Sequence, residues 1–298
     1  MDIPATGKIN LRVNLADYPV TMAMKDGRVA SSFVGLDFCG PPVAHDGFKA
    51  MLRDNAFDAG ELAIITFLQA KAYGKPYLLL PATISGRFQH HCIGYNSAHG
   101  DLKPKDIEGR RVGVRTYSQT TGLWVRGILQ HEYGVDLDKV TWVTTEDSHL
   151  AEYRDPPNCL RLPGQKLGQM MLDGELAAGI FGNDMPKNAS VRPLIPDPKA
   201  AAEQWYRREG VVPINHMFAV HRDIARKRPD VVKELYRMIA ESRALAPASA
   251  LATIPPLDLE ANRKGLQMAI DWSLEQKIIP HRLSVDELFE DTIAAIAD

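Results

Sequence analysis

Side chains that handle protons and anions stand at a few isolated positions of the sequence. Glu61 lies in the apolar run GELAII, where a carboxylate must be paired, protonated or functional because an unpaired buried charge is costly. Arg87 precedes His90 in SGRFQHHCIGYN, and His216 lies in the strand-like run VPINHMFAV. Histidine transfers protons near neutral pH, and arginine holds a carboxylate through two parallel hydrogen bonds. Together these residues could act on a small anionic substrate.

Each of these residues also has a structural alternative. Glu61 could pair with a nearby arginine, Arg87 could form a salt bridge between lobes, and His216 could be a satisfied core histidine. We expect the segment around His90 to be an extended crossing from one lobe to the other. Because successive side chains of a strand point to opposite sides, only one of His90 and His91 can then face a cleft.

The stretch GRRVGVRTYSQTTGLWVRGILQHEYG, residues 109–134, predicts a strand, a polar loop and a helix in succession. Apolar residues repeat at helical spacing from Leu123 onward, and Gly134 ends the pattern. A helix start after a Ser/Thr-rich loop offers free N–H groups and the positive end of the helix dipole to an anion. We expect a carboxylate to bind near Thr120 and Thr121. The alternative is a hydroxyl that only caps the helix.

Two further polar candidates follow predicted strands. Tyr18 comes just after the strand predicted over residues 8–15, and open α/β sheets place ligand groups at the carboxyl ends of strands. The strand predicted over residues 176–181 ends in Gly182-Asn183-Asp184. Asp184 is therefore included among the candidates.

The order of the predicted elements indicates an α/β protein with two lobes. The chain of 298 residues suits two units of ordinary domain size. Two segments, MLRDNAFDAGELAI from Met51 and MLDGELAAGIFG from Met171, are weakly similar in sequence. This similarity supports two lobes with the same order of elements. We place lobe 1 at residues 1–86 and 214–298, and lobe 2 at residues 87–213. Beyond Ile224 the pattern is helical and carries no recognisable chemistry.

The amino-acid composition and the absence of known cofactor-binding and catalytic motifs restrict the kind of molecule that the protein is expected to bind. Hydrophobic and charged contents of 45% and 24%, with a formal charge of −2, give no reason to expect nucleic acid or a membrane surface. Three cysteines without metal-type spacing and a start without signal-peptide features favour the cytoplasm. Neither nucleotide-binding fingerprint occurs, nor does a G-x-S-x-G elbow or an H-E-x-x-H pair. We expect a small-molecule partner, no cofactor and no metal. The oligomeric state stays open, and a homo-oligomer is compatible with the sequence.

Several motifs together resemble the 4,5-dihydroxyphthalate decarboxylase family. They are the Asp17-Tyr18 start, the FDAGEL turn, the SGRFQHH crossing, RVGV-x-x-Y-x-x-T-x-x-x-W-V-R-G-I-L, the EYGVD that follows, and V-P-I-x-H. The resemblance extends to about Arg222 and is weaker in the C-terminal helices. It implies a type II periplasmic-binding-protein-like fold, with a mixed sheet flanked by helices in each lobe and the ligand in a cleft between the lobes.

The resemblance also implies a cofactor-independent aromatic decarboxylase that acts on a hydroxylated benzene carboxylate, with 4,5-dihydroxyphthalate giving protocatechuate. Gln89 and His91 stand where the family more often has Arg and Ser, and Arg115-Thr116 replaces an acidic position before Tyr117. A monocarboxylate or a differently substituted ring is therefore an alternative substrate.

Roles follow from the chemistry of decarboxylation, which needs electron supply from a ring hydroxyl, a proton donor and a fixed carboxylate. We assign proton transfer to His90 or His216 and include Glu61 among the catalytic residues, where it also contacts a phenol. The assigned substrate-binding residues are Arg87, Thr120, Thr121, Tyr117, Asp184, Tyr18 and Arg126.

Two other functions stay open. One is a solute-binding or ligand-sensing protein that uses the same cleft without chemistry. The other is a thiamine-precursor-type synthase, for which we would expect a cysteine-rich or multi-histidine site that the sequence does not contain.

Overall fold

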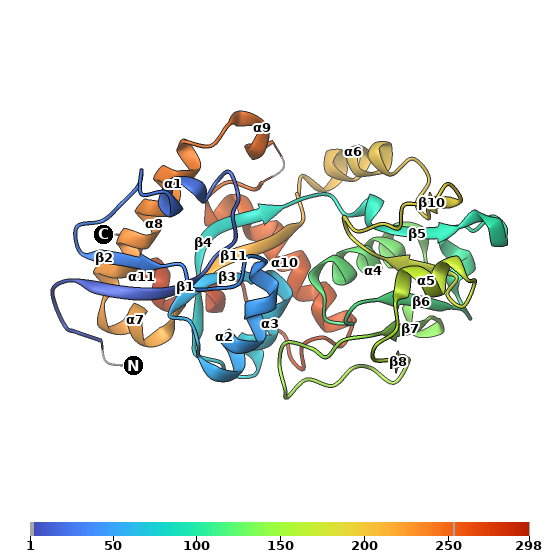
Figure 1. Cartoon of the computed structure of the whole chain (residues 1–298), viewed down its shortest axis with the longest axis horizontal. Coiled ribbons are helices and arrows are strands. Elements are labelled where there is room, and N and C mark those ends of the chain that lie inside the picture. Colours follow the sequence, from blue (N-terminus) through green and yellow to red (C-terminus); the bar gives the residue numbers. More distant parts are fainter. Residues whose placement is uncertain (1–2, 253, 298) are drawn as a thin grey trace.

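Two mixed β-sheets divide the molecule into two lobes (Figure 1). The computed structural model describes residues 3–252 and 254–297. Helices flank both sheets, so the predicted α/β fold class with two lobes is confirmed.

The first sheet contains five strands in the order β2-β1-β3-β11-β4. β1 is parallel to β2 and β3, whereas β11 runs antiparallel to β3 and β4. β4 is apolar and buried over most of its length, as expected for a strand covered on both faces. The strands of this sheet are β1 Ile9–Asn14, β2 Val34–Asp37, β3 Ala59–Ala63, β4 Tyr77–Gly86 and β11 Ile214–His221.

The second sheet contains six shorter strands in the order β10-β5-β9-β6-β7-β8. β6 lies parallel to β7 and β9, and β5 is antiparallel to both of its neighbours. The strands of this sheet are β5 Ile93–Asn96, β6 Arg111–Val114, β7 Thr141–Thr144, β8 Cys159–Arg161, β9 Ala178–Ile180 and β10 Val191–Pro193.

Helices connect the strands and form most of the C-terminal part of the chain. The helices are α1 Met22–Lys25, α2 Phe48–Asp54, α3 Ile64–Ala72, α4 Thr120–Tyr133, α5 Leu167–Leu172, α6 Pro198–Glu209, α7 Arg222–Lys227, α8 Pro229–Ala244, α9 Ala248–Leu251, α10 Leu259–Glu275 and α11 Glu290–Ala297.

The strand, loop and helix predicted over residues 109–134 are present as β6 and α4. Gln119 is the N-cap residue, and no side chain forms the capping hydrogen bond. Gly134 ends the helix with a φ of +64°, a left-handed conformation that glycine adopts without steric cost. The carboxyl end of β6 and the amino end of α4 therefore lie close together, as the sequence predicted.

Two crossing segments connect the lobes and run side by side. The backbone N–H of Arg87 donates to the carbonyl of Pro213 at 3.1 Å. The expectation of an extended strand around His90 is wrong, because His90–Cys92 forms a 3₁₀ turn before β5 begins. In a turn, neighbouring side chains do not alternate between two faces, so the argument from alternation does not apply here.

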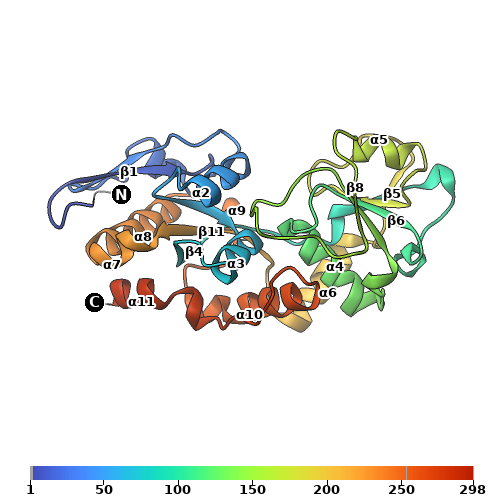
Figure 2. The same cartoon turned by 90° about the horizontal axis from the view of Figure 1, so that it is seen from below.

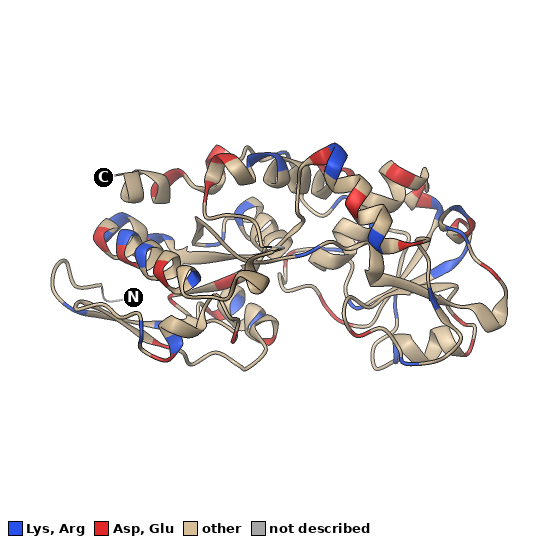
Figure 3. Ribbon diagram, turned by 90° about the horizontal axis from the view of Figure 1, so that it is seen from above, with Lys and Arg blue, Asp and Glu red and all other residues tan. Residues whose placement is uncertain are grey.

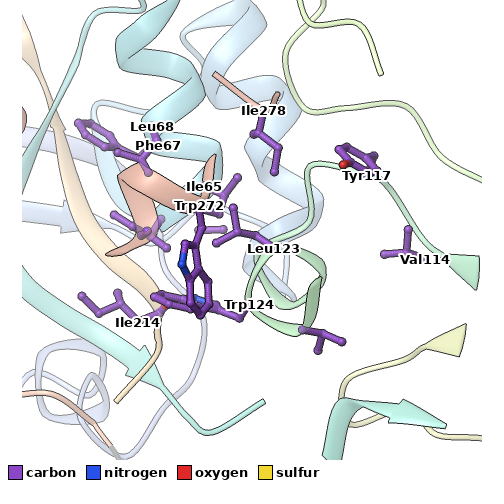
Figure 4. Packing of buried hydrophobic residues seen from close by; sticks show 14 of the residues in the cluster. Ile65, Phe67, Leu68, Val114, Tyr117, Leu123, Trp124, Ile214, Trp272 and Ile278 are labelled. Carbon is purple, nitrogen blue, oxygen red and sulfur yellow. The ribbon is translucent and has the colours of Figure 1, made fainter. Parts of the chain in front are cut away.

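Helix α10 ties the two lobes together by packing against α3 of one and α4 of the other (Figure 2). Trp272 from α10 meets Trp124 from α4 edge to face, with ring centroids 5.4 Å apart (Figure 4). The indole N–H of Trp124 donates to the carbonyl of Ile214 at 2.9 Å. One apolar core therefore continues from the first lobe into the second.

Replacing Gly127 by alanine should destabilise the protein, because the Trp272 ring lies directly on this glycine of α4. A Cβ at position 127 would lie 2.0 Å from Cε3 of Trp272. The ring has little room to move, since it also stacks on His131 with centroids 5.1 Å apart. Alanine favours the helix by roughly 1 kcal/mol over glycine, but the clash with the ring costs more. We therefore expect a net decrease of about 2 kcal/mol in the free energy of unfolding.

Chemical denaturation of Gly127→Ala beside Gly265→Ala tests this. Gly265 lies in α10, and a Cβ there would meet its nearest neighbour, Cγ1 of Val211, at 3.2 Å. We expect Gly265→Ala to change stability by less than about 1 kcal/mol. Equal stability of Gly127→Ala and the wild type would contradict the packing of α10 on α4.

Charged residues of both signs are interspersed over both lobes (Figure 3). This distribution agrees with the small formal charge of −2. None of the helices in the described ranges combines the length and the apolar composition needed to cross a bilayer.

Candidate active site

A polar cleft of about 490 Å³ lies between the two lobes. The first lobe and the crossing segments contribute Tyr18, His45, Phe48, Ala63, Thr66, Ser85, Gly86, Arg87, Asn215 and His216. The second lobe contributes Arg115, Gln119, Thr120, Thr121, His149, Phe181, Gly182, Asn183 and Asp184.

Glu61 and His216 form a hydrogen-bonded pair at the wall of the cleft. β3 and β11 are antiparallel, and His216 lies opposite Ala63. Glu61 precedes Ala63 by two residues, so Glu61 and His216 are diagonal neighbours on one face of the sheet. Nδ1 of His216 bonds to Oε2 of Glu61. Because Nδ1 is engaged, Nε2 is the ring nitrogen left for a ligand in the cleft.

Three donors surround the Glu61 carboxylate, which has no solvent exposure. The Ala16 N–H donates to Oε1 at 2.8 Å, and the Tyr18 hydroxyl donates to Oε2 at 3.1 Å. Burial, followed by the charge of Glu61, raises the pKa of Tyr18 above its ordinary range. Tyr18 therefore remains a hydroxyl donor, and Glu61 is paired with a histidine rather than with the arginine considered from the sequence.

Arg87 occupies the end of the cleft where the chain leaves β4. Its Nη2 donates to the hydroxyl of Thr121 at 3.3 Å. Its Nε is buried and has no hydrogen-bond partner among the residues that the structure describes. Gly182 lies against the guanidinium, and a Cβ there would be 3.1 Å from Nη2. The Nη2 end of the guanidinium therefore lies at the cleft wall beside Thr121, and a cation in this position suits an anionic ligand.

The first turn of α4 lies beside Arg87. Thr120 and Thr121 are the first residues of the helix, and both line the cleft. The first N–H groups of an α-helix have no partner within the helix and carry a partial positive charge. This end of the cleft therefore combines the Arg87 cation with a helix N-terminus.

His149 and His45 line the cleft near Arg115. Nδ1 of His149 is 2.8 Å from the hydroxyl of Thr66, and Phe48 meets its ring edge to face. Burial, followed by the positive charge of Arg115, lowers the pKa of His149 to about 3. The same two causes lower the pKa of His45. Both histidines are therefore neutral at physiological pH.

A loop of the second lobe carries His149 across to the first lobe. Arg53 of α2 donates from Nη2 to the Ser148 carbonyl at 2.7 Å and from Nε to the His149 carbonyl at 3.0 Å. Lys75 and Glu152 form a further contact between the lobes at 2.7 Å. These contacts fix the loop and place the imidazole of His149 in the cleft.

The structure brings seven of the ten predicted site residues to the cleft or directly behind it. His216, Arg87, Thr120, Thr121, Asp184 and Tyr18 line it, and Glu61 lies behind His216. Asp184 is exposed at the cleft margin.

His90 is a correction to the predicted site, because it lies outside the cleft. Only 1% of its surface is exposed, and its ring packs edge to face on Trp205 of α6. Its Nδ1 has no hydrogen-bond partner within the described residues. The 3₁₀ turn directs His90 toward α6, and His91 is the exposed neighbour.

Tyr117 and Arg126 are also corrections, because neither lines the cleft. Tyr117 precedes α4, and the Arg126 side chain projects from the inner face of this helix. The Arg126 guanidinium is fully buried, 3.9 Å from the centre of the Tyr117 ring. It donates from Nη2 to the Tyr117 carbonyl at 2.6 Å and from Nε to Gln276 at 2.8 Å. Arg126 follows Thr121 by five residues, which places it about 140° around the helix, so Arg126 faces inward while Thr121 faces the cleft.

Two curated relatives cover most of the chain. A 4,5-dihydroxyphthalate decarboxylase from Comamonas testosteroni is 28% identical over 259 residues, which are 80% of this chain and 76% of that protein. A 4,5-dihydroxyphthalate decarboxylase from Pseudomonas putida is 29% identical over 216 residues, which are 67% of this chain and 82% of that protein. Over most of its length, the chain is therefore similar to proteins named 4,5-dihydroxyphthalate decarboxylase. No family model matches the sequence.

A solved structure supports the fold. The periplasmic aliphatic sulphonate binding protein SsuA from Escherichia coli has a TM-score of 0.57 to this chain, at 16% sequence identity. The match covers 93% of this chain and 91% of that protein. The predicted periplasmic-binding-protein-like fold is confirmed.

Three charged or titratable residues that line the cleft were not among the predicted site residues: His45, Arg115 and His149. Arg115 directly follows β6, and His149 lies in the loop after β7. Tyr18 was chosen because ligand groups tend to follow the carboxyl ends of strands. The same rule, applied to β6 and β7, would have identified Arg115 and His149 as candidates. No set of three or more His, Cys, Asp or Glu side chains arranged to hold a metal ion occurs within residues 3–252 and 254–297.

Burial of His90 should make the stability of the protein sensitive to acid. Burial lowers the pKa of His90 to about 4, whereas an unfolded chain binds this proton near pH 6.5. Between these values the unfolded state holds more protons, so stability falls as the pH drops from about 6.5 to about 4. Near pH 4, this effect lowers the free energy of unfolding by on the order of 3 kcal/mol. We expect His90→Leu to abolish this decrease.

Urea denaturation at pH 7, 5.5 and 4 measures this effect. The exposed His281 provides a control, since His281→Leu should leave the pH dependence as in the wild type. If His90→Leu kept the full acid dependence of the wild type, His90 would not be a buried neutral histidine.

Proposed function

We propose that this chain is a cofactor-independent decarboxylase of a hydroxylated aromatic carboxylate, either 4,5-dihydroxyphthalate, giving protocatechuate, or a related compound. The observation that carries the proposal is the Glu61–His216 pair at the wall of a cleft that is also lined by Arg87. Similarity to two proteins named 4,5-dihydroxyphthalate decarboxylase supports the reaction class. Location in the cytoplasm, predicted from the sequence, is part of the same proposal.

Arg87, Thr121 and the first turn of α4 bind the carboxylate. Arg87 and Thr121 are already hydrogen-bonded to each other, so the binding groups are positioned before the substrate arrives. A carboxylate would accept from the guanidinium and from the helix N–H groups, which are strong charge-assisted hydrogen bonds. This grip fixes the ring relative to His216.

His216 delivers the proton. Glu61 accepts from Nδ1–H, which fixes the tautomer and stabilises the imidazolium form. Glu61 itself is held by Ala16 and Tyr18, so the imidazole has little freedom to rotate. The Phe48 ring meets the imidazole edge to face at 5.6 Å and offers an apolar surface for the aromatic substrate. His216 thus acts as a general acid of defined orientation.

The reaction balances with one proton. The imidazolium transfers H⁺ from Nε2 to the ring carbon that bears the carboxylate, and a C–H bond forms while a ring hydroxyl supplies electrons. The C–C bond to the carboxylate then breaks, its electron pair restores the aromatic ring, and CO₂ leaves. His216 regains its proton from solvent. The Arg87 guanidinium holds the carboxylate until the C–C bond breaks, and this contact orients the bond for cleavage.

CO₂ release from a panel of hydroxyphthalates and hydroxybenzoates tests the proposal. We expect release from at least one compound with a hydroxyl para to a carboxylate, and persistence of this activity after exhaustive chelation. Tight binding of these compounds without CO₂ release would instead identify a solute-binding or sensing protein. Loss of activity on chelation with recovery on adding a divalent metal would overturn the cofactor-independent form.

A further inference from the structure

A second cation, Arg115, lines the cleft at a place that the proposed proton transfer does not use. Its Nη1 donates to Glu146 at 3.2 Å, which leaves Nε and Nη2 for a ligand. Its backbone carbonyl accepts from the N–H groups of Thr145 and Glu146, so β6 and the loop after β7 fix its position. Arg115 is therefore a partly exposed cation held at the cleft wall.

The strand order of the first lobe separates Arg87 from the corner near Arg115. Arg87 follows β4. His45 lies in a 3₁₀ turn beside the carboxyl end of β1, because the Asn14 side chain donates to the carbonyl of the preceding residue, Ala44, at 2.9 Å. β11 and β3 lie between β4 and β1. With neighbouring strands roughly 5 Å apart, the backbones of β4 and β1 are on the order of 14 Å apart in the sheet. β11 and β3 carry His216 and Glu61, which therefore lie between the two ends.

The second lobe keeps the same order of groups along the cleft. Gly182, which contacts Arg87, follows β9. Arg115 follows the neighbouring strand β6, and His149 lies in the loop after β7, the next strand of the sheet. The cleft therefore has a cation near each end and the Glu61–His216 pair between them.

The corner at Arg115 contains groups that suit hydroxyl oxygens. His149 is hydrogen-bonded to Thr66 and is neutral, and its charge-free ring can accept from or donate to a hydroxyl. His45 is neutral for the same reason. Arg115 is thus the positive group of this corner, flanked by two neutral histidines. On a benzene ring whose carboxylate is held by Arg87, the para position points to the opposite end of the cleft.

We propose that Arg115 binds the ring hydroxyl para to the departing carboxylate and stabilises it as a phenolate. This inference rests on the proposed function and assigns the electron-supplying group of that reaction. A phenolate oxygen pushes electrons into the ring when His216 protonates the carboxylate-bearing carbon, and a ring C=O forms. When the C–C bond breaks, its electron pair returns to the ring and the phenolate is restored. The phenolate thus needs no net change in protonation during the step, and Arg115 is a catalytic residue.

The ionisation of a bound phenol tests Arg115 without turnover. The probe is 3,4-dihydroxybenzoate, whose 4-hydroxyl is para to its carboxylate, and phenolate formation is followed by ultraviolet absorbance against pH. We expect the wild type to lower the phenol pKa of the bound probe by about one unit or more, as an adjacent cation does. Arg115→Gln should abolish this shift, and Arg115→Lys should restore part of it.

Two controls define the result. Arg161→Gln removes an arginine outside the cleft lining and should leave the shift unchanged. Phthalate carries carboxylates but no hydroxyl, so Arg115→Gln should weaken binding of 3,4-dihydroxybenzoate by about tenfold while changing that of phthalate much less.

The proposal would be overturned if the bound probe ionised alike in the wild type and Arg115→Gln. It would also be overturned if phthalate lost as much affinity as the dihydroxy compound, because Arg115 would then bind a carboxylate. Failure of the proposed function is a separate result: a wild type that ionises the probe through Arg115 but releases no CO₂ from hydroxyphthalates.

Discussion

Replacing His216 by glutamine should lower kcat by about a hundredfold or more, with a much smaller change in KM. The variant keeps a polar side chain next to Glu61 but has no group that can protonate the ring carbon. Glu61→Gln should cause a loss of similar size, because the neutral amide cannot stabilise the imidazolium. The double variant should cost little more than either single change, since the two residues act as one unit.

A second histidine–glutamate pair in the protein provides a matched control. His131 and Glu275 are 2.8 Å apart on the surface, outside the cleft. His131→Gln removes the same kind of contact and should leave kcat within about twofold of the wild type. Steady-state kinetics on the compound that releases CO₂ measures all four variants. Full activity of His216→Gln would remove His216 from proton transfer.

The second large effect should come from Arg87→Ala, which we expect to lower kcat/KM by on the order of 2–3 kcal/mol, mainly through KM. The guanidinium contributes affinity and orientation through charged hydrogen bonds, and alanine removes both. Arg87→Lys should recover only part of the loss, because an ammonium group lacks the planar fork that matches a carboxylate.

Arg207 supplies the control for a general charge effect. It lies in α6 with 76% of its side chain exposed and does not line the cleft. Arg207→Ala should keep the kinetic constants of the wild type, even at low ionic strength. An unchanged KM in Arg87→Ala would show that the carboxylate is held elsewhere, and Arg115 would then be the next arginine to test.

The sequence alone determined features that depend on local spacing. The apolar repeat from Leu123 and the glycine at position 134 define α4, because helix periodicity and a left-handed C-terminal residue are encoded within one short stretch. The same holds for the apolar strand β4 and for the placement of Tyr18 after β1. Arg87, Thr120 and Thr121 reach the cleft because they stand at the ends of these locally defined elements.

Only the tertiary structure decided which distant residues meet. Glu61 and His216 are 155 positions apart, and their contact depends on the register of β3 against β11, which no local pattern specifies. His90 faces Trp205 because a 3₁₀ turn replaces the expected strand. In this turn, side chains do not point alternately to two faces as they would in a strand. The Arg126 side chain is buried on the inner face of α4, where Gln276 and the Tyr117 carbonyl accept its hydrogen bonds. Spacing along the chain sets periodicity, whereas the direction of a side chain at a lobe boundary is set by partners that folding brings from elsewhere.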